Sequence, residues 1–329
     1  MTKKELASKS NLTPMAITNY ENGTRKPTME IMQALAAALG VRVSDFLAVR
    51  NENLSFAHGE FRKQSSLTVA QQEYIHEFVE EYFSRFFTAV ELLGGEVLPS
   101  APNCHALTLT RDVEQDAQIL RKHLGLPADG PIADLIEIFE NIGILACTCE
   151  IDSDKFSGMN GFVSGRPYVV INAAMSAERK RSTIVHELAH LMFVWPEDMP
   201  EKETEELATA ISGAFLLPDK DLVRELGIRR RAVTRDMELV CQEYGVSMYL
   251  LVKRAALNGI LSAQAEKRFY VRAGYLGWQK REPSRIEAKA PILFEQLVYR
   301  AINEDNISIQ RGAELLQMPF SLVAQQCGL

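Results

Sequence analysis

The motif that decides the fold is His186-Glu187-Leu188-Ala189-His190. It lies inside the stretch 176–194, which begins with a capping serine and has the pattern of a strong helix. In such a helix His186 and His190 are about one turn apart on one face, so both imidazoles can bind one tetrahedral Zn²⁺. Glu187 would lie beside the metal, where a carboxylate can act as a general base.

The alternative is an ordinary helix that carries two surface histidines. Its neighbours argue against this, because most of them are large and apolar: Ile184, Val185, Leu188, Leu191, Met192 and Phe193. Burying two imidazoles and a carboxylate without a metal would leave polar groups short of partners. A structural zinc site is also disfavoured, because such sites normally use four protein ligands, often cysteines, and no cysteine is near the motif in the sequence.

A catalytic zinc site needs a third protein ligand and keeps one position for water. The next predicted helix offers Glu203, Glu205 and Glu206. Position 205 is favoured because two small residues, Ala208 and Ser212, continue its face and permit a close approach of the two helices. A glutamate in an acidic run is more often solvated than bound to a metal, so spacing alone leaves Glu205 open.

The composition is that of a globular protein. A length of 329 residues favours two or three domains, and no apolar run is long enough to span a membrane. The five cysteines are an odd, scattered set, which fits a reducing compartment, so we expect a cytoplasmic protein. The net charge is −7, but residues 1–50 hold seven basic and four acidic residues, which leaves −10 for the remainder. A cationic end on an anionic body is typical of a small DNA-reading module attached to another domain.

The remaining pattern predicts an α+β protein that is predominantly helical. Helices are expected over about 3–9, 14–22, 29–39, 68–93, 112–124, 132–141, 176–194 and 203–216. Strands are expected over 144–151 and 161–172, where Tyr168 to Ile171 is the clearest β pattern. Residues 219–329 are predicted to be helical throughout.

The chain resembles the ImmA/IrrE metallopeptidases, in the architecture with a Cro/C1 (XRE)-type helix-turn-helix in front. Residues 178–190 resemble the family's active-site helix, and Glu205 to Ser212, ending at Leu216-Leu217-Pro218, resembles its second conserved block. The resemblance implies that Glu205 is the third zinc ligand. It also implies a small thermolysin-like, gluzincin-like zinc fold with a short β-sheet, in an enzyme that cuts or inactivates a helix-turn-helix repressor or antitoxin.

The chain departs from the family pattern at Thr209, Ile211 and Ser212, so the substrate groove is expected to differ there. Two weaker stretches also look familiar. Phe61-Arg62-Lys63 resembles a junction in these fused proteins, and the segment 125–135 resembles the lead-in to the peptidase sheet.

The segment from Lys4 to Gly23 resembles the second and third helices of Cro/C1-type domains, in which the recognition helix presents its first residues to the major groove. Base contacts are expected from Thr13, Met15, Thr18 and Asn19, and phosphate contacts from Asn22, Arg25 and Lys26. The family's first helix would precede Thr2, where this chain begins, so the module is expected to lack that helix. The alternative is a helical docking module that no longer binds DNA.

Tyr168 is a candidate for stabilising an oxyanion, although a tyrosine in a strand usually only packs, and the strand near Gly161–Ile171 is a candidate for edge pairing with an extended substrate. Other residues are assigned to packing or to the surface. Cys147 and Cys149 would share a strand face and pack as small hydrophobes. Surface or capping positions are expected for His58, His76, His105 and His123, and a solvated face for Glu77, Glu80 and Glu81. A helical pair is expected over 307–323, for dimerisation or target docking.

The sequence therefore predicts a helix-turn-helix over 1–50, a linker over 51–66, a zinc metallopeptidase domain over 67–228 and an all-helical C-terminal domain over 229–329. We expect a hydrolase, a zinc-dependent endopeptidase with Zn²⁺ held by His186, His190 and Glu205 and with Glu187 as its catalytic base. The expected partners are a protein substrate and double-stranded DNA, with no membrane; a homodimer is left open. The alternative function is a DNA-binding transcription regulator or antitoxin whose zinc domain senses or binds rather than cleaves.

Overall fold

The computed structural model describes residues 1–41, 43–46, 51, 53–59, 67–151, 153, 155–278 and 282–328. The chain forms two compact units, Met1–Glu52 and Asn53–Leu329. The fold is α+β and predominantly helical, as the sequence predicts. None of the helices in the described residues is long and apolar enough to cross a membrane.

The first unit consists of helices α1 (Lys3–Lys9), α2 (Pro14–Glu21) and α3 (Met29–Leu39), followed by a 3₁₀ turn, Val43–Phe46. Each helix begins at a threonine whose hydroxyl accepts a backbone N–H, and α3 ends at Gly40 with a left-handed backbone. A small core holds the three helices together, formed by Ala7, Ile17 and Leu35 with partly buried Leu6, Leu12, Tyr20 and Ile31.

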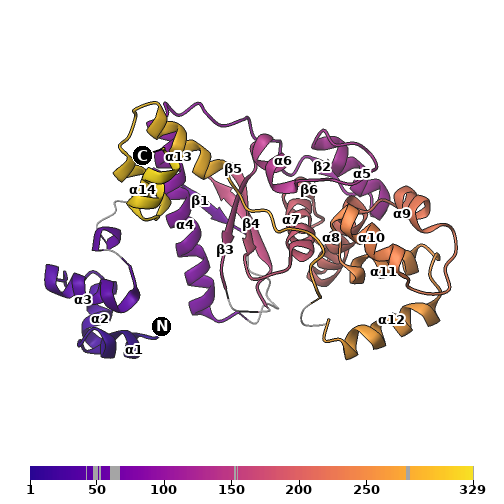
Figure 1. Ribbon diagram of the computed structural model, residues 1–329, viewed down its shortest axis with the longest axis horizontal. Helices are drawn as coiled ribbons and strands as arrows, with labels where there is room; N and C mark the ends of the chain where they lie inside the picture. Colours follow the sequence, from indigo (N-terminus) through magenta and orange to yellow (C-terminus); the bar gives the residue numbers. More distant parts are fainter. Residues whose placement is uncertain are drawn as a thin grey trace. The chain divides into compact units, whose positions relative to one another are not determined.

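The second unit is built on a four-stranded sheet in the order β1-β4-β5-β3 (Figure 1). The strands are β1 (Phe56–His58), β4 (Gly158–Val163), β5 (Arg166–Asn172) and β3 (Leu145–Cys149). β4 pairs antiparallel with β1 and β5, whereas β3 and β5 are parallel. A second, two-stranded parallel sheet joins β2 (Leu107–Thr108) to β6 (Phe193–Val194).

Helices cover both faces of the four-stranded sheet (Figure 1). The long helix α4 (Val69–Leu92) packs on one face, where Cys147, Tyr168 and Val170 join its apolar side chains in one core. The helix α7 (Ala177–Met192) packs on the other face, where Val169 and Ile171 join a second, larger core. Residues of β5 therefore alternate between two cores, as the two-residue period of a strand requires.

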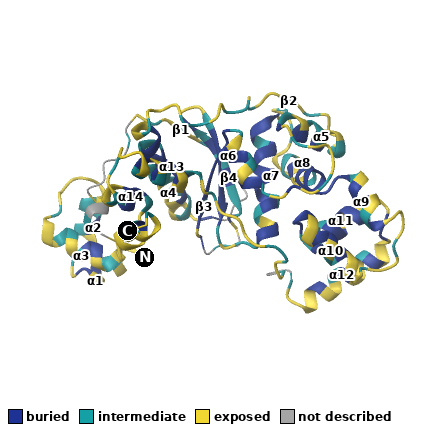
Figure 2. Ribbon diagram, turned by 45° about the horizontal axis from the view of Figure 1, so that its top comes forward, coloured by how far each residue is buried: buried dark blue, intermediate teal, exposed yellow. Residues whose placement is uncertain are grey.

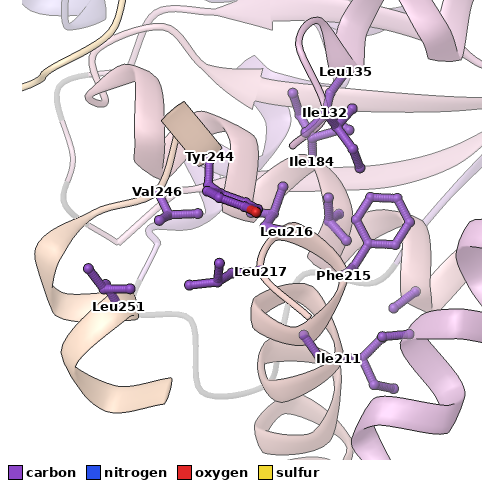
Figure 3. Close-up of a cluster of buried hydrophobic side chains, with 14 of the residues drawn as sticks. Ile132, Leu135, Ile184, Ile211, Phe215, Leu216, Leu217, Tyr244, Val246 and Leu251 are labelled. Carbon is purple, nitrogen blue, oxygen red and sulfur yellow. The ribbon is translucent and has the colours of Figure 1, made fainter. Parts of the chain in front are cut away.

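The larger core extends from α7 into the surrounding helices. These are α5 (Val113–His123), α6 (Leu135–Asn141), α8 (Glu201–Leu216), α9 (Asp219–Leu226), α10 (Arg235–Tyr244), α11 (Met248–Leu257) and α12 (Ala263–Tyr275). Figure 3 shows Ile184 of α7 near Phe215 and Leu216 of α8, with Ile211 further along α8 and Leu251 of α11 on the far side of Leu217. The two helices that matter most for the site, α7 and α8, are thus packed directly together.

The C-terminal part returns to the sheet. An extended segment, residues 282–292, crosses the unit and leads to α13 (Leu293–Asn303), α14 (Ile309–Leu316) and α15 (Phe320–Gln326) (Figure 1). Phe294, Leu297 and Val298 of α13 are buried in the same core as α4. Three carboxylates hold the segment by accepting backbone N–H groups: Glu282 from Met248, Glu178 from Arg285, and Glu140 from Leu293.

The helices lie close to where the sequence predicts them, but three features differ. The β pattern over 161–172 is a hairpin of β4 and β5, turned at Ser164 and Gly165, both of which have a positive φ. The expected linker 51–66 contains β1, a strand of the sheet, although residues 60–66 lie outside the described residues, as does the junction Phe61-Arg62-Lys63. Residues 229–329, expected as a separate domain, contribute to both cores of the second unit.

The burial of Glu140 should make the stability of the folded protein depend on pH. Burial raises its pKa to about 7, against two weak hydrogen bonds from the backbone N–H groups of Ile292 and Leu293 that lower it. Because the folded-state pKa lies above the unfolded value of 4.5, the stabilisation is present at low pH and is lost as the pH rises through about 7. We expect Glu140→Gln to remove up to about 3 kcal/mol of the fall in unfolding free energy between about pH 5 and pH 8.

Chemical denaturation at both pH values measures this difference. Glu137→Gln is the matched control, because Glu137 is exposed on the same helix. An equal pH dependence in Glu140→Gln and the wild type would contradict the prediction.

Candidate metal centre

The helix α7 carries polar side chains into the interior of the unit. Ser176 caps it by accepting the Arg179 N–H, and the helix is buried along most of its length (Figure 2). His186 and Glu187 are 7% and 6% exposed, whereas His190 is half-buried near the end of the helix. Buried groups of this kind need partners, so the arrangement around them decides what the helix can do.

Ligand atoms of three side chains converge between α7 and α8. Nε2 of His186 lies 3.2 Å from Nε2 of His190. Nε2 of His186 lies 3.3 Å from Oε2 of Glu205, and Nε2 of His190 lies 3.3 Å from the other oxygen, Oε1. Ligands held at about 2.0–2.1 Å from a tetrahedral zinc ion are about 3.3–3.4 Å apart, so each of these separations is close to that between two ligands of a tetrahedral site.

The chemistry of the three donors also fits zinc. Two imidazole nitrogens and one carboxylate oxygen are ligands that zinc accepts, and three protein ligands leave a fourth position open, as in catalytic sites. In the described part of the chain, His186, His190 and Glu205 are the one group of metal-binding side chains that gathers this closely.

Among the three acidic candidates on α8, only Glu205 reaches the histidines. Glu203 faces Arg111 at 3.9 Å and Glu206 faces Lys202 at 3.8 Å, and both carboxylates are exposed. The close packing expected from the small residues is present, because Ala208 and Ser212 are buried and the Ser212 hydroxyl donates to the Ser182 carbonyl of α7.

Glu187 lies beside the cluster and is held by β4. The side-chain amide of Asn160 donates to Oε2 of Glu187 at 2.8 Å. This contact depends on Gly158, where a Cβ would come within 2.7 Å of both the Thr183 methyl group and the Val170 carbonyl oxygen. The glycine therefore lets α7 lie close to the sheet, and the sheet supplies the amide that orients the carboxylate.

The two histidines have further partners behind the cluster. Nδ1 of His186 lies 3.2 Å from the Thr209 hydroxyl of α8. With a metal bound at Nε2, Nδ1 would carry the proton and donate it to this hydroxyl. The ring of His190 lies 5.3 Å from that of Trp195, whose indole N–H donates to the Ala189 carbonyl. Such contacts fix the tautomer and orientation of the imidazole rings.

Each of the two units contains a segment that matches a known protein family. Residues 139–256 match a peptidase family described as the IrrE N-terminal-like domain, and residues 1–46 match the family described as helix-turn-helix. The first unit is thus similar to helix-turn-helix domains, and part of the second unit is similar to IrrE-like peptidase domains. Among curated proteins, none matches the chain significantly.

The match to the peptidase family runs from α6 to α11 and includes Glu187 and the three residues of the cluster, His186, His190 and Glu205. It omits α4, α5 and the C-terminal helices, which the structure packs against the matched segment. The resemblance predicted from the sequence is confirmed for both parts of the chain.

Asn160 and Trp195 are residues of the peptidase domain that the sequence interpretation missed. Asn160 lies in the strand Gly158-Met159-Asn160-Gly161-Phe162. Because side chains alternate between the two faces of a strand, a polar residue between Met159 and Phe162 could have been recognised as a candidate for a polar site. Which face of the sheet it occupies, and therefore its contact with Glu187, follows only from the pairing of β4 with β5.

Tyr168 does not lie at the candidate metal centre. It is fully buried on the α4 face of the sheet, opposite α7, and its hydroxyl bonds to Nδ1 of His58 at 2.6 Å. The strand that carries it, β5, is paired on both sides, so it has no open edge for a substrate. The expectation of edge pairing is therefore wrong, because β5 is central in the sheet, whereas Tyr168 packs in the core, as is usual for a tyrosine in a strand.

His58 and His76 are not surface or capping residues as expected. Their rings stack with centroids 4.2 Å apart, and Nε2 of His58 lies 3.0 Å from Glu80. Glu80 is therefore part of a half-buried polar network rather than of a solvated face. Cys147 and Cys149 pack in the α4 core as expected, and burial raises the pKa of Cys149 to about 12, which disfavours a thiolate.

The helix-turn-helix module leaves most of the expected DNA-contacting residues at its surface. Met15 is 68% exposed, and Asn22, Arg25 and Lys26 are also exposed. The hydroxyl groups of Thr13 and Thr18 are engaged within α2, with the Ala16 N–H and the Pro14 carbonyl respectively. Thr13 therefore has a structural role as the cap of α2, and Asn19 is half-buried.

A substitution of Thr209 should change the metal affinity although Thr209 is not itself a candidate ligand. Thr209→Val removes the oxygen that accepts the Nδ1 proton of His186, and loss of such a contact typically costs about 10–100-fold in metal affinity. We expect the zinc affinity of Thr209→Val to fall by about this factor, as measured by competition with a chromophoric chelator. Thr209→Ser keeps the hydroxyl and should keep the affinity; equal affinities for the valine variant and the wild type would refute the assigned contact.

Proposed function

We propose that the second unit is a zinc-dependent endopeptidase. The observation that carries the proposal is the convergence of His186, His190 and Glu205 at tetrahedral spacing, with Glu187 beside them on the same helix. The match of residues 139–256 to an IrrE-like peptidase family supports the same conclusion. A zinc ion held by the three ligands would supply Lewis-acid polarisation of a carbonyl group and a lowered pKa for water.

Glu187 is proposed as the general base. Its Oε2 accepts a hydrogen bond from Asn160, which leaves Oε1 for the proton of an attacking water. The carboxylate would take that proton as the water oxygen bonds to the carbonyl carbon. It would pass the proton to the leaving nitrogen as the C–N bond breaks, which gives a carboxylic acid and an amine. Asn160 holds the carboxylate in one orientation during both transfers.

The surroundings of the cluster support a protein substrate. A cleft of about 2100 Å³ begins at Glu205 and Thr209 and is bounded by residues of α8, α11 and the segment around Trp278. Small-molecule pockets are typically about 300–1,000 Å³, so this cleft is of a size that suits a peptide segment. Its lining carries both basic and acidic side chains, including Arg179, Lys253 and Glu282.

We propose a helix-turn-helix repressor or antitoxin as the protein substrate, because the chain itself carries a DNA-binding type of module. A protease attached to such a module would be brought to the DNA sites at which its target is bound.

The second candidate function is a DNA-binding regulator whose zinc domain binds or senses rather than cleaves. The match of residues 1–46 to helix-turn-helix proteins favours DNA binding in either case.

Metal content tests the ligand set first. We expect about one zinc ion per chain in the wild type and in Glu187→Gln, because Glu187 is not a ligand. Glu205→Ala should lose most of the bound metal, since it removes one of three protein ligands. Glu206→Ala is the matched control, because Glu206 is the exposed neighbour on the same helix. Elemental analysis of purified protein measures all four; a wild type that binds no added zinc would remove the basis for the peptidase proposal.

Cleavage separates the two candidate functions. Removing a general base typically lowers the rate by about 10²–10⁴-fold, so Glu187→Gln should keep its metal and cleave a candidate repressor at least about 100-fold more slowly. Gel analysis of helix-turn-helix proteins from the same genomic neighbourhood, incubated with each variant, provides the measurement. If Glu187→Gln relieves repression as well as the wild type does, the sensing function is favoured over cleavage.

A further inference from the structure

The second unit carries a concentration of basic side chains far in sequence from the metal ligands. Arg229 and Arg231 lie in the connection between α9 and α10, and Lys267, Arg268 and Arg272 lie on α12. All five are exposed. The guanidinium of Arg268 donates to the Arg231 carbonyl, and a β-bridge joins Arg230 to Leu261 just before α12, so the two segments are side by side. We call these five residues the cationic patch.

The charges of the patch are not neutralised locally. Arg230 and Arg235, which lie between or beside the patch residues in sequence, are paired with Asp236 and Glu238. By contrast, no carboxylate of a described residue forms an ion pair with any of the five patch side chains. Residues 51–329 together carry a net charge of −10. The five unpaired cations therefore form a local positive region on a part of the chain that is negative overall.

Exposed apolar side chains adjoin the cations. Tyr275 is 90% exposed and Ile228, next to Arg229, is 83% exposed. Arg268, Arg272 and Tyr275 are spaced four and three residues apart, so they share one face of α12. Arginine and tyrosine side chains on one face can contact consecutive phosphates, the arginines through paired N–H groups and the tyrosine through its hydroxyl.

We propose that the cationic patch binds the phosphate backbone of double-stranded DNA. Four of its five cations are arginines, whose planar N–H fork matches a phosphate better than the point charge of lysine. Duplex DNA is the polyanion to which a helix-turn-helix module brings the chain, so the choice of occupant rests on the DNA-binding part of the proposed function. The metal centre plays no part in it. The patch adds sequence-independent affinity, because phosphate contacts carry no base information.

The test is the salt dependence of binding by the full-length protein. Fluorescence anisotropy of a labelled duplex of about 20 base pairs and arbitrary sequence gives Kd over a range of KCl concentrations. The patch variant combines Arg229→Ser, Arg231→Ser and Arg272→Ser, and it spares Arg268 because that side chain also joins two segments. Each lost phosphate contact reduces the slope of log K against log salt by about 0.9, so we expect a reduction of about 2–3 and affinity at least about tenfold weaker at low salt.

A charge-matched variant separates the patch from the overall charge. Lys289→Ser, Arg300→Ser and Arg311→Ser remove the same three positive charges from exposed positions elsewhere in the second unit. This variant should keep the wild-type salt slope. If the patch variant and the charge-matched variant bind alike, the proposal is overturned, and an acidic protein segment becomes the partner to test at this surface.

A second variant separates the patch from the helix-turn-helix module. Asn19→Ala, Arg25→Ser and Lys26→Ser change the module alone. We expect this variant to retain some salt-dependent DNA binding, and we expect that binding to disappear when the patch substitutions are added. This result would support the patch even if the module itself does not bind DNA. Complete loss of binding in the module variant, with a normal slope in the patch variant, would assign all DNA binding to the module and overturn the proposal.

Discussion

The structure depends on the burial of polar side chains on α7. Two imidazoles and a carboxylate are placed in a helix that is otherwise packed with apolar residues, and the desolvation of such groups is unfavourable unless each finds a partner. The partners come from both sides: Glu205 and Thr209 from α8, and Asn160 from β4. The two contact surfaces of α7 are therefore constrained together, because a shift of the helix toward one would lengthen its contacts with the other.

The strand β4 makes this arrangement possible because two of its residues are glycines. Gly158 lets α7 approach the sheet from one face, and Gly161 makes room on the opposite face for the hydroxyl group of Tyr168. A Cβ at either position would meet backbone or ring atoms that cannot move easily. One strand thus separates two polar systems, the candidate metal centre on the α7 face and the network of Tyr168, His58 and Glu80 on the α4 face.

Much of this could be predicted from the sequence because it is encoded locally. The helix α7 begins at Ser176 and α3 ends at Gly40, as capping rules predict, and the histidine spacing shows which side chains share a face. For Glu205, the small residues Ala208 and Ser212 on its helix face favour it over Glu203 and Glu206, but the stronger argument is the family resemblance. The contact of Asn160 with Glu187 depends on the register of the β4–β5 hairpin and on the packing of α7 against it. The contacts of His58 could not be predicted, because they depend on the pairing of β1 with β4, about 100 residues further along the sequence. For the same reason β1 was interpreted as part of a linker.

The segment that matches the peptidase family is smaller than the unit that the structure forms. If residues 139–256 stood alone, the face of the sheet that carries Tyr168 and Val170 would lose α4 and α13, which now bury it. The other face would lose α5, whose Arg121 is fully buried and donates to the Phe215 carbonyl of α8. Hydrogen bonds join the C-terminal segment to the matched part. Glu140 and Glu178 of the matched part accept backbone N–H groups of the segment, and Glu282 of the segment accepts the Met248 N–H of α11. The candidate metal ligands are therefore positioned by a compact unit that extends over residues 53–329, with the helices on both sides of the matched segment as part of it.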